Sequence, residues 1–235
     1  MSYVEAEISG TTAWITLNRP EKLNAFTLEM YEALRFKIEE FGTDQELHAV
    51  VIRGAGRALS SGFDRNAPVE DLSEALQLTN ACRWAIWDCP IPVVIAAHGY
   101  CLGGAFELTY PADLVIATDT CRFGVPEVKD GVSAGFNMLP WLANHKIVKA
   151  WMLTGELRSA TEALAAGLVT HIASENEFVS QTNDLTERLG SVPRHTLVAV
   201  KAATNRVPEH LNMRGIIDGE VVTHAGKGLF DGSQP

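Results

Sequence analysis

The chain is short of positive charge. Its 235 residues include 19 Lys and Arg against 29 Asp and Glu, which gives a formal net charge of −10. Nucleic-acid binders neutralise phosphates with clustered Lys and Arg, so this balance argues against a nucleic-acid partner. It argues equally against a basic protein of the membrane surface. We therefore expect neither nucleic acid nor membrane among the partners of this protein.

Cysteines are few and long hydrophobic runs are missing. The cysteines form no C-x-x-C pair, so we expect reduced thiols in or near the core rather than disulfides or a metal site. No stretch has the roughly 18 apolar residues of a membrane span, and the N-terminus lacks the pattern of a signal peptide. These absences predict a cytoplasmic protein. The four cysteines are Cys82, Cys89, Cys101 and Cys121.

Several catalytic motifs are also absent. The sequence has no P-loop, no G-x-S-x-G and no H-E-x-x-H. Gly54-Ala55-Gly56 follows a predicted strand but lacks the third glycine of a dinucleotide fingerprint. The histidines are scattered along the chain, so we expect no metal.

What the chain does contain is an alternation of strand and helix patterns. This alternation implies parallel strands with crossover helices up to about residue 150, and the chain beyond residue 172 reads as mostly helical. The first two strands read as a hairpin, and Ser159 with Glu162 has the pattern of a capping box. The fold class is therefore α/β. Strands are predicted at residues 3–8, 13–17, 49–52, 93–97 and 114–117, and helices at residues 28–41 and 70–88.

Three loop segments adjoin predicted strand ends, where α/β proteins place their sites. They are residues 59–64, 99–107 and 123–127. Glycines in the first two allow backbone N–H groups to approach a ligand oxygen, and two such groups can form an oxyanion hole. Taken alone, the Gly103-Gly104 pair also fits an ordinary tight turn, and Glu107 also fits a solvated helix position. The three segments together favour a catalytic site.

These segments resemble the enoyl-CoA hydratase/isomerase (crotonase) superfamily over nearly the whole chain. Residues 18–25 (Asn-Arg-Pro-Glu-Lys-Leu-Asn-Ala) are similar to its N-terminal signature, and residues 90–107 to its central one. Residues 153–155 and 165–169 match later landmarks. The resemblance implies a crotonase-like ββα spiral core at residues 1–155 and a shortened helical C-terminal region at 156–235. It also implies that this region mediates trimerisation, giving a homotrimer or a dimer of trimers.

The resemblance assigns roles to specific residues. The backbone N–H groups of Phe63 and Gly104 would form the oxyanion hole for a thioester carbonyl. Glu107 would hold and activate water, and Glu127 would exchange the proton at Cα. A glutamate that is protonated at neutral pH needs a desolvated pocket or a nearby like charge, and two facing glutamates supply the latter.

The resemblance further implies contacts to an acyl-CoA, with coenzyme A as part of the substrate and no permanently bound cofactor. Phe136 and Trp141 are bulkier than the family's usual residues in the acyl pocket, although both also fit core packing. Because coenzyme A is polyanionic and the chain is acidic, we expect a local basic island at Arg53, Arg57 and Arg65. The implied substrate-binding residues are Lys22, Ala25, Arg57, Ser61, Asp64, Arg65, Gly103, Gly131, Phe136 and Trp141.

The leading functional prediction is the reversible hydration of a 2-enoyl-CoA to a 3-hydroxyacyl-CoA by a lyase. One alternative is another enolate reaction at the same oxyanion hole, namely isomerisation, C–C hydrolysis or decarboxylation. A second alternative is a relative that binds coenzyme A or RNA without catalysis, which the two glutamates and the negative charge disfavour. The Gly-rich end of the chain predicts that the family's covering helix is missing from this region, so that the lid is either absent or supplied from elsewhere.

Overall fold

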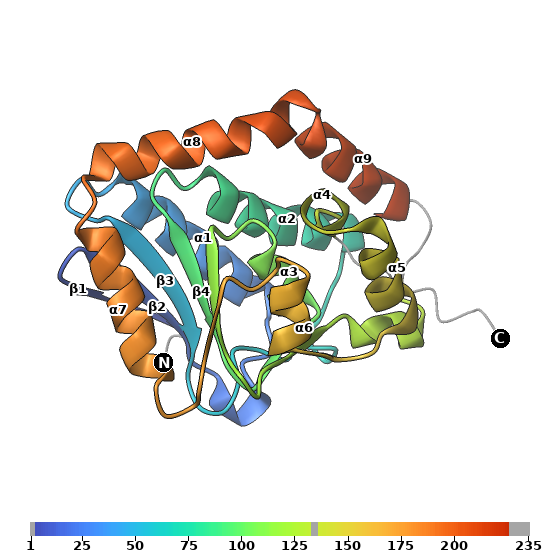
Figure 1. Ribbon diagram of the computed structural model, residues 1–235. Coiled ribbons are helices and arrows are strands. Elements are labelled where there is room, and N and C mark those ends of the chain that lie inside the picture. Colours follow the sequence, from blue (N-terminus) through green and yellow to red (C-terminus); the bar gives the residue numbers. More distant parts are fainter. Residues whose placement is uncertain (1–2, 133–135, 226–235) are drawn as a thin grey trace.

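A six-stranded sheet forms the centre of the computed structural model, which describes residues 3–132 and 136–225 (Figure 1). Its strand order is β1-β2-β3-β4-β6-β9. The first pair is antiparallel and every later pair is parallel, as the alternation of strands and helices predicted. The strands are β1 (Val4–Ser9), β2 (Thr12–Leu17), β3 (Ala49–Gly54), β4 (Val93–Ala97), β6 (Leu114–Thr118) and β9 (His171–Ala173).

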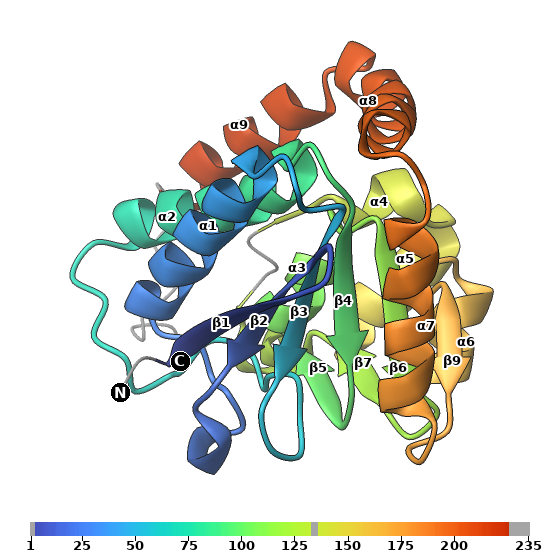
Figure 2. The same ribbon diagram turned by 90° about the vertical axis from the view of Figure 1, so that its left-hand side faces the viewer.

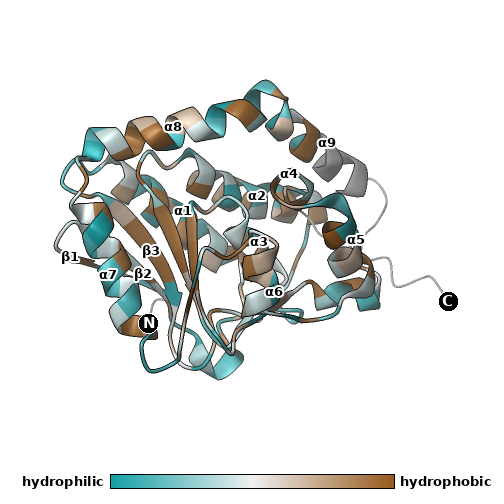
Figure 3. Cartoon of the chain, in the orientation of Figure 1, coloured by the Kyte–Doolittle hydropathy of each residue, from teal (hydrophilic) through white to brown (hydrophobic). Residues whose placement is uncertain are grey.

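Helices cover both faces of this sheet (Figure 2). Helices α1 (Leu28–Thr43) and α2 (Leu72–Asp88) lie on one face, and α7 (Phe178–Gly190) lies on the other. Alternate residues of β3 serve the two sides: Val50 packs in the larger core, and Val51 packs in a smaller cluster that includes a leucine of α7. The inner strands β3 and β4 are therefore largely hydrophobic, and Figure 3 shows them mostly brown between the helices, whereas the edge strand β1 buries only Val4.

A second sheet of three short strands was not predicted. It consists of β5 (Tyr100–Leu102), β7 (Arg122–Gly124) and β8 (Arg158–Ser159), in that order. Two or three residues are too few to display a strand alternation in the sequence. The sheet matters because β5 leads into α3 (Gly104–Thr109) and β7 leads into the 3₁₀ helix η2 (Pro126–Asp130). Pairing of β5 with β7 thus brings two loops from separate parts of the chain together.

The predicted helical C-terminal region is present. The capping box of α6 is confirmed, since the Glu162 N–H donates to Ser159 Oγ at 3.2 Å and the Ser159 N–H donates back to Glu162 Oε2 at 2.8 Å. The boundary at residue 155 and the role in trimerisation stay predictions, and residues 226–235 lie outside the described residues. The remaining helices are η1 (Pro20–Lys22), α4 (Leu139–Leu142), α5 (His145–Thr154), α6 (Ala160–Ala165), α8 (Arg194–His210) and α9 (Met213–Ala225).

The last two helices fold back over α2 (Figure 1). The indole N–H of Trp87 donates to Glu209 at 2.9 Å, and that of Trp84 donates to Asp218 at 2.8 Å. All four cysteines are buried and unpaired, as predicted. Across residues 3–132 and 136–225, none of the helices combines the length and apolar character that crossing a bilayer requires.

Candidate active site

Three chain segments are hydrogen-bonded into one layer at the strand ends. The Phe26 N–H donates to the Gly62 carbonyl at 2.8 Å, and the Asp64 N–H donates to the Phe26 carbonyl at 2.8 Å. On the other side of the loop, the Leu102 N–H donates to the Ser60 carbonyl at 3.2 Å. The loop of residues 59–64 is therefore held between the N-terminal signature and β5.

Close approach of two glycines brings the predicted oxyanion-hole residues together. A Cβ atom on Gly62, whose φ is +98°, would lie 2.9 Å from the Leu102 oxygen and 3.5 Å from the Gly103 Cα. The residues that follow these two glycines are Phe63 and Gly104. Within the described residues, neither of their backbone N–H groups donates a hydrogen bond. Two free donors on adjacent loops can polarise a carbonyl oxygen.

Glu107 lies on α3, one turn beyond this pair, and is 3% exposed. The reading of Glu107 as a solvated helix residue is therefore wrong. Its Oε2 forms an ion pair with the guanidinium of Arg83 from α2, and its Oε1 accepts the Phe136 N–H at 3.2 Å. A buried carboxylate is tolerated because both of its oxygens have donors.

Glu127 reaches the same place from η2. A Cβ atom on Gly103 would lie 2.7 Å from Glu127 Oε1, so the carboxyl group rests against the Gly103-Gly104 turn. Gly103 has a φ of +50°, which adds a second reason for glycine at this position. The small sheet thus places both glutamates around one turn, although they are 20 residues apart in the sequence.

The two glutamates have different surroundings. The pKa of Glu127 is raised to about 7, mainly by burial, and the negative charge of Glu107 contributes to the increase. The backbone hydrogen bond of Glu127, Arg65 and Arg83 all act in the opposite direction. The predicted like-charge coupling is present, but burial is the larger cause. Glu127 is therefore able to accept and donate a proton near neutral pH.

Comparison with known proteins identifies the family of this chain. The family model described as "Enoyl-CoA hydratase/isomerase" matches residues 7–224. The chain belongs to the enoyl-CoA hydratase/isomerase family. It is 32% identical over 221 residues to a carnitinyl-CoA dehydratase of Salmonella enteritidis PT4, covering 90% of this chain and 84% of that protein.

Solved structures show the same fold. An enoyl-CoA hydratase/isomerase from Xanthobacter autotrophicus Py2 matches with a TM-score of 0.92 and 31% identity, covering 100% of this chain and 89% of that one. An enoyl-CoA hydratase/carnithine racemase from Magnetospirillum magneticum matches with a TM-score of 0.83 and 27% identity, over 88% of this chain and 81% of that one. The predicted crotonase-like fold is confirmed.

Residues 18–25, which resemble the N-terminal signature of the enoyl-CoA hydratase/isomerase family, support the loop of residues 59–64. Arg19 Nη1 forms an ion pair with Asp64 at 2.7 Å and donates to the Ala25 carbonyl at 3.1 Å. The hydrogen bond from Arg19 lowers the pKa of Asp64. Asp64 and Ala25, two predicted substrate contacts, are thus joined by Arg19, which the sequence interpretation did not single out.

Two more predicted contacts are Lys22, within the same signature, and Ser61, which is bonded to it. The Ser61 N–H donates to the Leu23 carbonyl at 2.9 Å, and Lys22 is exposed at the end of η1. The amide of Asn24 donates to the Ala58 carbonyl at 2.9 Å. These bonds attach η1 to the loop after β3 and leave the ammonium of Lys22 at the surface.

The predicted basic island is divided. Arg53 pairs with Glu7 at 2.7 Å, and Arg65 pairs with Asp130 of η2 at 2.5 Å. Arg53 and Arg57 line one cavity of about 640 Å³ between the strand ends and α7, and Arg65 is not among its lining residues. Within the described part of the chain, Arg57 is the member of the three without an ion pair.

The residues predicted for the acyl pocket occupy different environments. Phe136 is fully buried, and its ring meets that of Trp84 edge to face at 5.0 Å. Trp141 is half-buried on α4, and Gly131 is exposed with a φ of +81° at the end of η2. Residues 133–135 of this segment lie outside the described residues. Phe136 packs in the core, and its N–H donates to Glu107. Its role in an acyl pocket stays a prediction.

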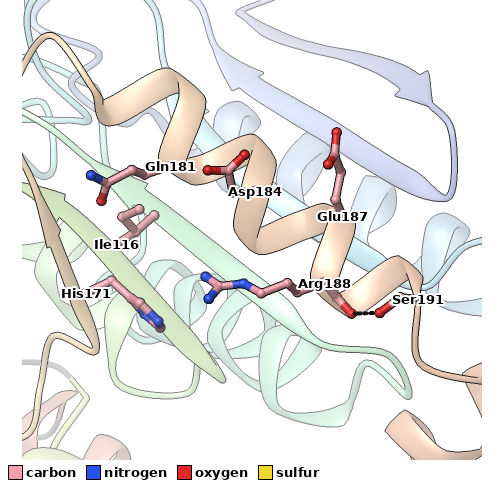
Figure 4. A pocket seen from close by; sticks show the side chains of 7 residues that line it. All are labelled: Ile116, His171, Gln181, Asp184, Glu187, Arg188 and Ser191. Atoms are coloured by element: carbon pink, nitrogen blue, oxygen red, sulfur yellow. Dashed lines mark hydrogen bonds between the residues drawn. The ribbon is translucent and has the colours of Figure 1, made fainter.

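A second cavity, of about 770 Å³, lies away from the glutamates between α7 and the edge of the sheet (Figure 4). It contains Asp184, Glu187, Arg188 and His171, and none of the predicted site residues. Burial, and then the charge of Arg188, lowers the pKa of His171. Across residues 3–132 and 136–225, no group of three or more His, Cys, Asp and Glu side chains is arranged to hold a metal ion.

Sequence interpretation missed Arg83 and Tyr31. Both are buried against the Gly103-Gly104 turn. A Cβ atom on Gly104 would lie 2.2 Å from the Tyr31 hydroxyl and 3.6 Å from Arg83 Nη2. A signal was available, since Asn80 and Arg83 are spaced three apart on the face of α2 that also carries the buried Cys82 and Ile86. Polar residues at core positions of an amphipathic helix indicate a buried partner.

Proposed function

We propose that the protein catalyses the reversible addition of water to a 2-enoyl-CoA, giving a 3-hydroxyacyl-CoA. One observation carries the proposal: two glutamates from separate elements meet at a turn with free backbone donors, and one of them has a pKa of about 7. Hydration needs an acceptor for the water and a group that exchanges a proton at Cα. The described site offers a candidate for each.

The reaction follows from these positions. The N–H groups of Phe63 and Gly104 donate to the thioester oxygen and stabilise the enolate as it forms; losing one such donor typically costs about 10²–10³-fold in rate. Glu107 accepts a hydrogen bond from the attacking water, whose oxygen bonds to Cβ. Glu127 delivers a proton to Cα and regains one from the water. Overall, H and OH add across the double bond and neither glutamate is consumed.

The proposed substrate set follows the relatives. A dehydratase is the same chemistry run in reverse, so carnitinyl-CoA belongs in the set beside short and aromatic 2-enoyl-CoA thioesters. Coenzyme A enters as part of the substrate, with Lys22 and Arg57 as proposed phosphate contacts because both cations lack an ion pair among the described residues. We propose no resident cofactor, and a homotrimer or dimer of trimers as the assembly.

The test follows the loss of conjugated-thioester absorbance on that substrate set. Wild-type protein is expected to consume at least one 2-enoyl-CoA and to form the 3-hydroxy product. Glu127→Gln is expected to lower the rate by about 10²–10⁴-fold. The control is Glu187→Gln, in the second cavity between α7 and the edge of the sheet, and it is expected to match the wild-type rate. Tight binding of coenzyme A with no turnover of any thioester would contradict hydration and support a binding protein.

One observation favours isomerisation as a second candidate. Both oxygens of Glu107 already accept hydrogen bonds, which leaves Glu127 as the carboxyl group free to move a proton. A single acid is sufficient to shift a double bond between C3 and C2. A gain of conjugated absorbance with a 3-enoyl-CoA, without any hydration of the 2-enoyl product, would favour this reaction over the first.

A further inference from the structure

Arg83 is a buried cation inside the core of the molecule. Its side chain is 4% exposed, on the face of α2 that packs toward α3. Burying a guanidinium is costly unless its charge is paired. The pairing comes from Glu107 Oε2, and Asn80 Oδ1 accepts a second bond from Nη1 at 2.7 Å. The core therefore holds this cation in one orientation.

Two aromatic rings complete its surroundings. The guanidinium carbon lies 5.6 Å from the ring centroid of Tyr31 and 5.5 Å from that of Phe136. A planar cation between ring systems has little freedom to rotate. The fixed guanidinium in turn restricts the orientation of the Glu107 carboxylate that it contacts.

We infer that Arg83 is a positioning residue that fixes the carboxylate of Glu107 for the reaction, and this inference rests on the proposed hydration. Arg83 does not touch the reacting atoms in this assignment. It acts through Glu107, by setting which way the carboxylate points and which of its lone pairs stay available.

The hydrogen-bond count supports this role. An ionised carboxylate has about four acceptor positions. Arg83 occupies one on Oε2 and the Phe136 N–H occupies one on Oε1. Acceptor positions on both oxygens remain for a water molecule. Two fixed donors therefore orient Glu107 without exhausting it.

The location of the pair also sets it apart from a purely structural contact. Arg83 Nη2 lies 3.6 Å from the position of a Cβ on Gly104, the residue proposed to donate to the thioester oxygen. Nε of Arg83, Nδ2 of Asn80 and the hydroxyl of Tyr31 are buried without a partner among the described residues. Three polar atoms without a partner in the described part of the chain thus lie beside the turn, where they are available to water or to a bound molecule.

The groups that surround the pair simplify its pH dependence. Facing it are Tyr31 of α1, Cys82 of α2, Tyr110 after α3, and Glu127 of η2, with Arg65 nearby. Burial raises the pKa of Tyr31, Tyr110 and Cys82, the last to about 12. Near neutral pH, Glu127 is thus the group of this set that changes charge. Because Arg83 lowers the pKa of Glu127, removing this cation makes Glu127 bind its proton more tightly.

The experiment compares Arg83→Met, Arg83→Lys and a matched control, Arg194→Met. Arg194, the first residue of α8, is partly buried. Its guanidinium donates to the carbonyls of Leu47 and Gly42, away from the glutamates. Arg83→Met is expected to lower kcat by about 10²-fold, as misplaced catalytic groups do, with KM within about threefold. Because Arg83 lowers the pKa of Glu127, the fall of the hydration kcat near pH 7 should move to higher pH. Arg83→Lys should recover part of kcat, and Arg194→Met should lower stability alone.

Three results would overturn the inference. They are a folded Arg83→Met protein with wild-type kcat and pH profile, a loss of kcat no larger than in Arg194→Met with an unshifted profile, and no recovery with lysine. Failure of the proposed hydration is recognised separately, because wild type would then hydrate none of the thioesters. In that case ¹³C NMR titration of the glutamate carboxyls decides: midpoints that move up in Arg83→Met support the inference, and unchanged midpoints overturn it.

Discussion

Two ion pairs with buried cations lie beside α2, and they are built differently. Arg83 meets Glu107 near the middle of the helix, and Lys201 of α8 meets Asp113 beside its end. The ammonium of Lys201 donates to Asp113 at 2.7 Å and to the carbonyls of Ile86 and Ile91 at 3.0 and 3.3 Å. Its three protons therefore have three acceptors.

The first pair is less complete. Arg83 keeps an unpartnered Nε, and a buried tyrosine hydroxyl beside it is also unpartnered among the described residues. A fully satisfied pair of the second kind joins α8 to the end of α2 and to the loop before β6. An incompletely satisfied pair at a glycine turn is suited to orienting one carboxylate. The same type of interaction thus serves the fold in one place and the site in the other.

Neutralising the acid of each pair gives the largest expected difference. Glu107→Gln replaces the charged acceptor proposed for the attacking water by a weaker, neutral one, so we expect a loss of activity of about 10²–10⁴-fold. Asp113→Asn leaves Lys201 buried without a counter-charge, so we expect a loss of about 3–5 kcal/mol in the free energy of unfolding. Rates per folded molecule and denaturant titrations measure the two effects. Equal losses of activity in both variants would remove the distinction between the pairs.

The glycine turn gives the next largest effect. Gly104→Ala places a methyl group 2.2 Å from the Tyr31 hydroxyl, so the turn must shift and the donor with it. We expect a drop in kcat of about 10²-fold, comparable to losing one oxyanion donor. Gly219→Ala in α9 is the control: its Cβ meets nothing within 4 Å, and we expect it to stabilise the helix by about 0.4–1 kcal/mol. Combining Gly104→Ala with Tyr31→Phe should recover part of the rate.

The pH dependence offers a third test, with opposite signs for the two directions of the reaction. Hydration needs Glu127 protonated, so its kcat should fall as pH rises through about 7. Dehydration needs the carboxylate to remove the Cα proton, so its kcat should rise through the same pH. Each limb should approach tenfold per pH unit. Parallel profiles for the two directions would show that Glu127 is not the proton-exchanging group.

The smallest effect is expected at the surface ion pair between Arg65 and Asp130. Both side chains are more than half exposed, so Asp130→Asn should change the free energy of unfolding by less than about 1 kcal/mol. Its effect should shrink further with added salt, because exposed charges are screened. A large, salt-independent loss of stability in a thermal melt would show that this surface pair contributes to folding as the pairs of Arg83 and Lys201 do, and would contradict the prediction.

The sequence predicted the large elements well because their hydrophobic patterns are long. The hairpin of β1 and β2 and the apolar run of β3 lie where the alternation put them. The strands of the second sheet have two or three residues each, too few for a pattern, and their pairing depends on contacts distant in sequence. That sheet is what places Glu127 beside Gly103, so the catalytic geometry came from family resemblance and not from periodicity.

The sequence predicted the loop residues of the site but not the buried residue Arg83 that contacts them. Glycines and glutamates next to strand ends indicated Gly104, Glu107 and Glu127, and the structure places all three around one turn. Arg83 escaped because a charged residue within a helical pattern is usually assigned to the solvent face. The spacing of α2 places Arg83 on the buried face, but its partner Glu107 arrives from α3, and no local pattern contains that contact.

Trp84 has a practical consequence for following the molecule in solution. Its ring contacts Phe136 on the side of the site, its indole N–H reaches Asp218 of α9, and the guanidinium of Arg214 lies 4.1 Å from its ring centroid. Indole fluorescence responds to both kinds of neighbour. A chain with Trp84 as its one retained tryptophan would therefore carry an intrinsic optical reporter, reading the docking of the C-terminal helix and the repacking next to Arg83 in a single signal.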